Sequence, residues 1–368
     1  MDLSDYTLDT LHRHGEFVLS RCRPRTGTNA YAPSVLVVMP RSEHPRTDSI
    51  RMMEHEHSLR AELDPAWAVR PVELTQHEGQ TALILEDPGG EPLDQLVGTP
   101  MEMGQFLRVA IGLSVAVRRL HGRGVIHKDL KPANIIVEPS TGQVWLMGFG
   151  IASRLPRERQ SAEPPEFIAG TLAYMAPEQT GRMNRSIDSR SDLYALGVTL
   201  YEMLTGTLPF SASDPMEWVH CHIAKQALAP AERRKDVPHS VSGIITKLLA
   251  KTTEERYQTA AGLESDLRRC LAELAAGFIL EAGFKCSRSS NRVYHVVRIK
   301  PGLIHLLLSA KLAIRGLQCR TLISRGLSAL GHSKWINGRV SCGKRAAWSS
   351  CNSNPSKFSW RCFSVAAT

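Results

Sequence analysis

The stretch His-Lys-Asp-Leu-Lys-Pro-Ala-Asn, at His127–Asn134, decides which fold this chain is expected to adopt. Before it, apolar residues recur at every third or fourth position from Met103 to His121, a spacing typical of a helix with one buried face. After it, the apolar run Ile135–Val137 favours a short strand. Such a polar loop has two interpretations. Either it caps the helix and has no further role, or its polar side chains act together in a site. The neighbouring segments have to distinguish these two interpretations.

This loop resembles the catalytic loop of bacterial serine/threonine protein kinases, whose motif reads H-R-D-L-K-P-x-N. The resemblance implies that Asp129 accepts a proton from a substrate hydroxyl and that Lys131 reaches the transferred phosphoryl group. It also implies that Asn134 is a Mg²⁺ ligand, with ATP as the nucleotide. The expected architecture is therefore the two-lobed α+β fold of protein kinases, with a small β-rich N-lobe and a larger helical C-lobe.

A second segment, Gly170–Glu178, resembles the end of a kinase activation segment and closes on Ala-Pro-Glu. In the family, the threonine of this segment contacts the catalytic aspartate and lysine. The resemblance therefore implies that Thr171 lies beside Asp129 and Lys131.

Two further segments resemble the framework of the kinase C-lobe. Ser191–Gly197 resembles the buried helix whose aspartate, here Asp192, braces the catalytic loop. Glu255–Tyr257 resembles the site whose arginine, here Arg256, pairs with the glutamate of Ala-Pro-Glu, here Glu178. These residues support the fold and carry no information about activity.

The resemblance covers about residues 5 to 275, so we expect a kinase-like domain at 1–275. Its predicted parts are an N-lobe at about 1–87, a hinge at 86–90 and a C-lobe at 91–275. Strands are predicted at Phe17–Leu19, Val35–Val38 and Thr81–Leu85, with a helix at Asp48–Leu63 between the last two. Further helices are predicted at Ser191–Leu204, Pro215–Lys225, Val241–Ala250 and Thr259–Leu271.

The N-lobe lacks two groups with which kinases hold nucleotide. The first hairpin of a kinase carries G-x-G-x-x-G, whereas Gly15–Ser20 contains one glycine. The third strand should end in a lysine that binds the α and β phosphates, and Val38 stands in its place. The helix residue expected to pair with that lysine is Glu56, with Glu54 as an alternative. The resemblance implies that Glu56 belongs to the cofactor-binding residues, whereas the missing lysine favours a solvated helix residue.

The predicted hinge is also unusual. Leu85 and Glu86 align with the residues that hold adenine in kinases, and the Glu86 carbonyl remains available as an acceptor. Pro88 falls where a kinase offers a backbone N–H to the base, and proline has none. Losing one such hydrogen bond costs roughly 0.5–1.5 kcal/mol.

The largest departure is Met-Gly-Phe-Gly at Met147–Gly150, where kinases carry Asp-Phe-Gly. The missing aspartate would bind Mg²⁺, and Gly148 has no side chain to do so. Asn134 alone is a poor magnesium site, because Mg²⁺ prefers carboxylate and phosphate oxygens. Phe149 and His127 remain, and we expect them to stack between the lobes.

Two hypotheses about function follow from the same residues. The first is a kinase-fold signalling module, a regulatory pseudokinase with little or no phosphotransfer and weak or absent binding of ATP and Mg. The alternative is an active serine/threonine protein kinase that transfers the γ-phosphate of ATP to protein hydroxyls with unusual nucleotide-binding groups. Val38 and Gly148 favour the first, and the complete set Asp129, Lys131 and Asn134 favours the second.

A narrower resemblance points to possible partners. Gly148–Arg159 and Glu178–Arg185 look like the kinase-like domain at the N-terminus of long bacterial proteins that also contain an ATPase region, a sensor region and a histidine kinase. This resemblance implies protein partners, among them a histidine kinase or other signalling domains.

The region from 276 onward differs in composition from the rest of the chain. Ala282–Thr368 holds 15 Lys and Arg residues and no Asp or Glu, and it is rich in Ser, Arg and Cys. We expect a basic tail that is disordered or translated out of frame. The alternative is a basic arm for nucleic acid or membranes, with a short amphipathic helix at Gly302–Ile314.

The net charge of +9 belongs to that tail, since residues 1–281 carry 30 basic and 36 acidic side chains, a net of −6. A specific nucleic-acid partner is therefore not expected for the main domain. No apolar stretch approaches the ~18 residues of a membrane span, and Met1–Thr10 has no signal-peptide pattern. The expected location is the cytoplasm, with reduced cysteines and no zinc-ligand spacing.

Overall fold

The computed structural model describes residues 3–25, 33–154, 157–158, 170–183, 185–281, 285–289, 292–299 and 336–341. The chain divides into two compact units, Met1–Ala275 and Ala276–Thr368. Among the residues it describes, no helix has the length and apolar character needed to cross a lipid bilayer.

The second unit contains three described strands, β11 (Lys285–Ser289), β12 (Arg292–Ile299) and β13 (Ile336–Ser341), which form an antiparallel sheet in that order. The predicted helix at Gly302–Ile314 lies outside the described residues. The disordered or out-of-frame character of this region stays a prediction.

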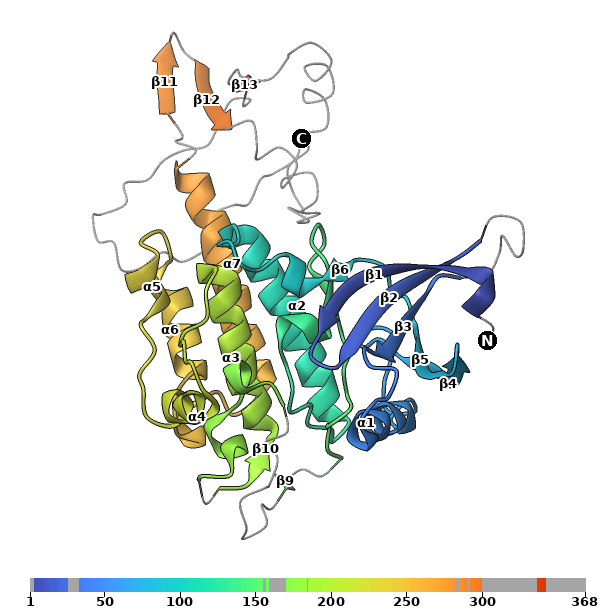
Figure 1. Cartoon of the computed structure of the whole chain (residues 1–368). Coiled ribbons are helices and arrows are strands. Elements are labelled where there is room, and N and C mark those ends of the chain that lie inside the picture. Colours follow the sequence, from blue (N-terminus) through green and yellow to red (C-terminus); the bar gives the residue numbers. More distant parts are fainter. Residues whose placement is uncertain are drawn as a thin grey trace. The chain divides into compact units, whose positions relative to one another are not determined.

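The N-lobe of the first unit is a five-stranded antiparallel sheet next to one helix (Figure 1). Its strands, in the spatial order β1-β2-β3-β5-β4, are β1 (Tyr6–His14), β2 (Phe17–Pro24), β3 (Val35–Pro40), β5 (Gln80–Glu86) and β4 (Pro71–His77). The central strands β2, β3 and β5 were predictable from their apolar runs. The edge strands β1 and β4 were missed because both are rich in polar residues.

Alternation along β3 decides which side chains face the helix. Val35 and Val37 pack into one apolar cluster with Tyr6 of β1. Leu36 and Val38 face the opposite side, toward Met53 of α1 (Thr47–Ser58). Val38 therefore lies on the sheet face that packs against the helix carrying Glu56. The helix ends five residues earlier than predicted, where residues 59–62 form turns.

The C-lobe is helical around a large apolar core, as expected for the protein kinase fold. Its helices are α2 (Met103–Gly122), α3 (Ser189–Thr205), α4 (Pro215–Ile223), α5 (Pro230–Arg233), α6 (His239–Leu248) and α7 (Ala260–Glu281). A small sheet follows the catalytic loop and packs against α2 through β8. Its strands, in the order β6-β7-β8, are β6 (Glu91–Pro92), β7 (Ile135–Glu138) and β8 (Gln143–Leu146). Among the α-helices of the described residues only the four-residue α5 was not predicted, and of the small sheet only β7 was predicted.

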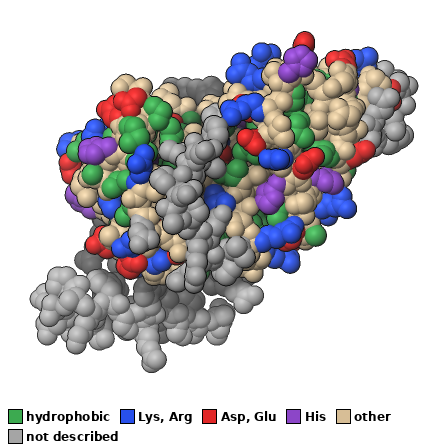
Figure 2. All heavy atoms as spheres, turned by 60° about the horizontal axis from the view of Figure 1, so that its bottom comes forward, with side chains coloured by type: hydrophobic (Ala, Val, Ile, Leu, Met, Phe, Trp, Pro, Cys, Tyr) green, Lys and Arg blue, Asp and Glu red, His purple; other side chains and the backbone are tan. Residues whose placement is uncertain are grey.

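The surface charge of the first unit is mixed. On the face shown in Figure 2, the Lys and Arg side chains of the described residues are interspersed with Asp and Glu side chains. This distribution agrees with the near balance of acidic and basic residues in positions 1–281.

Candidate active site

The catalytic loop is fixed by one buried carboxylate, that of Asp192 on α3. Its Oδ2 accepts the backbone N–H of His127 at 2.9 Å and its Oδ1 accepts that of Lys128 at 2.8 Å. His121 at the end of α2 donates to Oδ2 at 2.8 Å. Burial alone would raise the pKa of Asp192, but the hydrogen bond from His121 and the neighbouring histidines outweigh it and hold the pKa below its ordinary value. The predicted bracing role of Asp192 is confirmed.

Asp129 lies at the centre of a compact polar cluster. Lys131 Nζ is 2.7 Å from Asp129 Oδ2 and also donates to the hydroxyl of Thr171. The backbone N–H of Thr171 donates to Asp129 Oδ1 at 2.9 Å. The structure therefore brings together the three residues that the resemblance had placed side by side, with the carboxylate held by donors on both oxygens.

Asn134 belongs to the same cluster, and it contacts Asp129 and Gly148. Its Nδ2 donates to the backbone oxygen of Asp129 at 2.8 Å and to Asp129 Oδ2 at 3.0 Å. Gly148 has φ +77°, in the left-handed region, and a Cβ added there would lie 2.7 Å from both Cγ and Oδ1 of Asn134. The carboxamide of Asn134 thus fills the space that a side chain at position 148 would enter.

Glu56 corrects one prediction from the sequence. It is 7% exposed rather than solvated, and its Oε1 accepts the backbone N–H of Gly148 at 3.0 Å. Burial raises the pKa of Glu56 to about 7, against the lowering effect of hydrogen bonds from the backbone of Phe149 and Gly148. In place of the missing strand lysine, the carboxyl group of α1 binds the backbone of the Gly148–Phe149 segment. The contact that the structure shows for Glu56 is therefore with the backbone of Gly148.

This burial makes the stability of the chain depend on pH. The pKa of Glu56 rises on folding from 4.5 to about 7, so the folded state holds the proton more tightly. Stability from this group is full below 4.5, falls as pH rises toward 7 and is constant above. The total change is about 3 kcal/mol. We expect Glu56→Gln, which keeps an acceptor for Gly148, to remove that fall.

The measurement is urea denaturation of both proteins at about pH 5 and about pH 8. Glu54→Gln, an exposed neighbour on the same helix, is the matched control and should leave the pH dependence unchanged. An unaltered pH profile in Glu56→Gln would show that Glu56 is not the buried group described here.

Phe149 and His127 form the packed core beneath this cluster. Their ring centroids are 4.7 Å apart, both side chains are fully buried, and His127 Nε2 donates to the carbonyl of Met147 at 3.0 Å. The two rings pack together as predicted, but they are tilted at 42° to each other rather than stacked. Phe149 of the Met-Gly-Phe-Gly segment has therefore kept the packing role that the resemblance implied for it.

The hinge is braced by a residue that the sequence did not single out. Arg21 of β2 donates through Nε and Nη2 to the carboxylate of Asp87, at 2.8 and 3.0 Å, and through Nη2 to the carbonyl of Gly90 at 2.9 Å. The Asp87 side chain is only 2% exposed. Arg21 is two positions from Leu19, whose side chain packs with α1, so strand alternation places Arg21 on the same face of the sheet.

The side chains of Leu85 and Glu86, the two residues predicted to hold adenine, contact other parts of the chain in this structure. The side chain of Leu85 is completely buried in the apolar cluster beside α1. The carboxylate of Glu86 accepts from Arg70 Nε at 2.9 Å. The side chains of Leu85 and Glu86 both contact other groups of the chain. Of the predicted adenine contacts, the Glu86 carbonyl remains as the acceptor.

Strand β1 also reaches across to the segment that follows the hinge. Gln95 Nε2 donates to the carbonyl of Leu11 at 2.8 Å, and His12 Nδ1 lies 3.5 Å from Asp94 Oδ2. Burial lowers the pKa of His12, the nearby Asp94 opposes this effect, and Lys131 adds to it.

The C-lobe frame contains the predicted buried ion pair. Arg256 donates to Glu178 through Nη1 at 2.7 Å and through Nη2 at 2.9 Å, and both side chains are at most 1% exposed. Ser191 Oγ adds a hydrogen bond to Glu178 Oε1 at 2.7 Å. The pairing inferred from the resemblance is confirmed.

Comparison with known proteins agrees with this geometry. A family model described as "Protein kinase domain" matches residues 27–267. The chain belongs to the protein kinase family. Among curated relatives, serine/threonine-protein kinase PknB of Mycobacterium tuberculosis (strain ATCC 25177 / H37Ra) is 35% identical over 189 residues, which is 51% of this chain and 30% of the relative.

Two other relatives give the same picture. Serine/threonine-protein kinase Pkn1 of Myxococcus xanthus is 37% identical over 194 residues, covering 52% of this chain and 28% of the relative. A probable serine/threonine-protein kinase of Streptomyces coelicolor is 31% identical over 191 residues, covering 51% of this chain and 28% of the relative. This kinase-family chain thus spans less than a third of the curated relatives it matches.

Proposed function

We propose that this chain is a regulatory pseudokinase, a kinase-fold signalling module that transfers little or no phosphate. The observation that carries the proposal is the relation between Gly148 and Asn134. Position 148 has no carboxylate, and the side chain of Asn134 fills the space such a group would enter while donating to Asp129. One neutral carboxamide is a weak partner for Mg²⁺, which prefers carboxylate and phosphate oxygens. The residues present therefore do not fit Mg-ATP as kinases hold it.

Contacts at the mouth of the cleft support the same proposal. Arg21 ties β2 to Asp87 and Gly90, and β1 reaches the segment at 94–95 through Leu11 and His12. These contacts join the sheet to the hinge and to the segment after it, and in this proposal they hold the lobes in an arrangement that nucleotide would have to open. Val38, on the face toward α1, offers no charge to phosphates once they have entered.

The further parts of the proposal concern location and partners. We propose a cytoplasmic protein whose kinase-like domain binds other signalling domains, a histidine kinase among them. The resemblance of Gly148–Arg159 and Glu178–Arg185 to the kinase-like domain of multidomain bacterial signalling proteins supports this proposal.

The second candidate function is that of an active serine/threonine kinase. One observation favours it: Asp129, Lys131 and Thr171 are in mutual contact, the arrangement expected of a loop that accepts a substrate hydroxyl. In this candidate, a partner or substrate would supply the missing charge at the phosphates.

Calorimetric titration of the full chain with ATP, with and without Mg²⁺, tests the proposal together with a phosphotransfer assay on itself and a generic Ser/Thr substrate. We expect weak binding that is indifferent to Mg²⁺, and phosphotransfer near background. Each missing group costs ~10²–10³-fold, by analogy with the loss of one preorganised charge-stabilising group. Phosphotransfer at an ordinary kinase rate that disappears in Asp129→Asn would establish the second candidate instead.

A further inference from the structure

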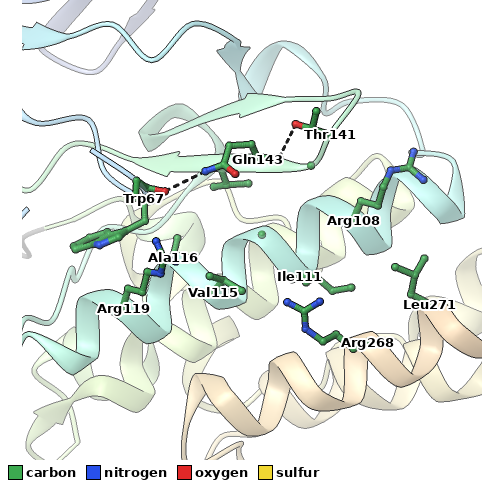
Figure 3. A pocket seen from close by; sticks show the side chains of 14 residues that line it. Trp67, Arg108, Ile111, Val115, Ala116, Arg119, Thr141, Gln143, Arg268 and Leu271 are labelled. Carbon is green, nitrogen blue, oxygen red and sulfur yellow. Dashed lines mark hydrogen bonds between the residues drawn. The ribbon is translucent and has the colours of Figure 1, made fainter. Parts of the chain in front are cut away.

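A hollow of about 500 Å³ lies on the C-lobe, away from the catalytic loop, between α2, the turn that joins β7 to β8, and α7 (Figure 3). Its wall between the two helices is apolar and is formed by Ile111, Val115 and Leu271. Arginines 108, 119 and 268 also line it, and no Asp or Glu does. The hollow thus combines an apolar surface with positive charge.

The walls of this hollow are held by close backbone contacts. A Cβ added at Gly112 of α2 would lie 2.2 Å from the carbonyl oxygen of Gly142, so the β7–β8 turn rests directly on the helix. Gln143 Nε2 donates to the carbonyl of Ala66 at 3.1 Å and ties the turn to the segment carrying the buried Trp67. A site with such walls is formed before any ligand arrives, which lowers the ordering cost of binding.

The arginines of the hollow are incompletely neutralised. Within the described part of the chain, Arg108 and Arg119 have no hydrogen-bond or ion-pair partner, and the Nε of Arg108 is buried. Arg268 is held by Glu264 at 2.8 Å, and that carboxylate also accepts from Arg118 at 2.9 Å. One carboxylate therefore serves two guanidinium groups, and the region keeps a positive charge.

The spacing of the unpartnered arginines limits the size of a ligand. Arg108 and Arg119 are eleven positions apart on α2, about three turns, so they share one face with Cα atoms roughly 16 Å apart along the axis. Figure 3 shows them at opposite ends of the hollow, with Arg268 between them on the α7 side. A single phosphate or small carboxylate cannot reach both, whereas about five residues of extended chain at ~3.3 Å each can.

We propose that this hollow is a docking site for an acidic segment of a partner protein, with carboxylates near both ends and apolar side chains between them. The segment comes from another molecule, because Ala282–Thr368 contains no Asp or Glu and would be repelled. The site does not involve Asp129, so it exists whether or not the cleft transfers phosphate. The proposed partner segment is thus defined by its acidic charge and by the length needed to reach both arginines.

Fluorescence anisotropy of the full chain tests this assignment. The probe is a fluorescein-labelled octapeptide with two glutamates at each end and leucines between them, compared with the same peptide carrying lysines instead. The double variant Arg108→Ala/Arg119→Glu should weaken binding of the acidic probe about tenfold or more. Arg123→Glu/Arg269→Ala makes the same change of three charges at two exposed arginines outside the hollow, at the end of α2 and on α7, and should change binding less than about twofold.

Three results would overturn the proposal. The first is equal weakening by both double variants, which would assign binding to general positive charge, including that of residues 282–368. The second is absence of binding to the wild-type chain. The third is displacement of the labelled probe by inorganic phosphate or glutarate at the same concentration at which the unlabelled acidic peptide displaces it. That result would make the hollow a small-anion site. Unchanged midpoints of urea denaturation establish that the variants are folded. If the double variant is unstable, the single variant Arg119→Glu, at an exposed position, is used for the binding measurement instead.

Discussion

Replacing Arg256 by alanine should lower the free energy of unfolding by about 3–5 kcal/mol, because it leaves the buried Glu178 carboxylate without its charged partner. Arg256 also donates to the carbonyls of Ala250, Lys251 and Arg190, at 2.8, 3.1 and 3.1 Å. All of these acceptors lose the Arg256 donor together, while Ser191 Oγ still donates to Glu178 Oε1. Urea denaturation of the full chain measures the change.

Two comparisons make this result specific. Arg269→Ala removes an arginine whose side chain is 66% exposed and should change stability by less than about 0.5 kcal/mol. Asp129→Ala, in the partly exposed cluster of the cleft, should cost clearly less than Arg256→Ala. If Arg256→Ala were as silent as Arg269→Ala, the described frame of the C-lobe would be wrong.

Restoring the two missing charges should create nucleotide binding that depends on Mg²⁺. In Val38→Lys/Gly148→Asp, lysine stands on the sheet face toward α1 and aspartate stands where kinases bind the metal. A hydrogen bond to a charged group contributes roughly 1.5–3 kcal/mol, so the affinity for Mg-ATP should rise about tenfold or more. Calorimetric titration with and without Mg²⁺ is the measurement.

The local structure sets a cost on this variant. A side chain at 148 has to displace Asn134 from Asp129, and the left-handed backbone there costs ~1–2 kcal/mol for a residue other than glycine. Val38→Met/Gly148→Asn is the matched control, because it makes similar steric changes without adding charge. Equal affinities in the two double variants, or a gain indifferent to Mg²⁺, would contradict the account of the missing charges.

The parts of the site that lie in motifs shared with the kinase family could be predicted from the sequence. Asp129, Lys131 and Thr171 lie together as expected, and so do Glu178 and Arg256, because the kinase frame fixes their positions. The site residues that were missed interact with groups a sequence does not display. Glu56 is buried because backbone N–H groups of the Gly148–Phe149 segment satisfy its carboxyl, and α1 otherwise reads as a polar helix.

Contacts between distant positions were missed for a related reason. Arg21 and Asp87 are 66 residues apart, and only the pairing of the sheet strands brings β2 to the hinge. The role of Asn134 as a metal ligand stays a prediction, and the sequence did not indicate that its Nδ2 donates to Asp129 beside the glycine at 148. Both contacts, that of Arg21 with Asp87 and that of Asn134 with Asp129, depend on how the folded chain packs, which a sequence does not display.

The brace formed by Arg21 between β2 and the hinge has a consequence for how any nucleotide affinity should be read. A ligand that enters only an open cleft has an apparent affinity equal to its intrinsic affinity multiplied by the fraction of molecules that are open. Each ~1.4 kcal/mol by which the braced state is favoured lowers that fraction tenfold. If nucleotide entry requires this brace to open, binding constants for this chain report that conformational population together with the fit, and a partner that loosens the brace would increase ATP affinity without contacting the nucleotide.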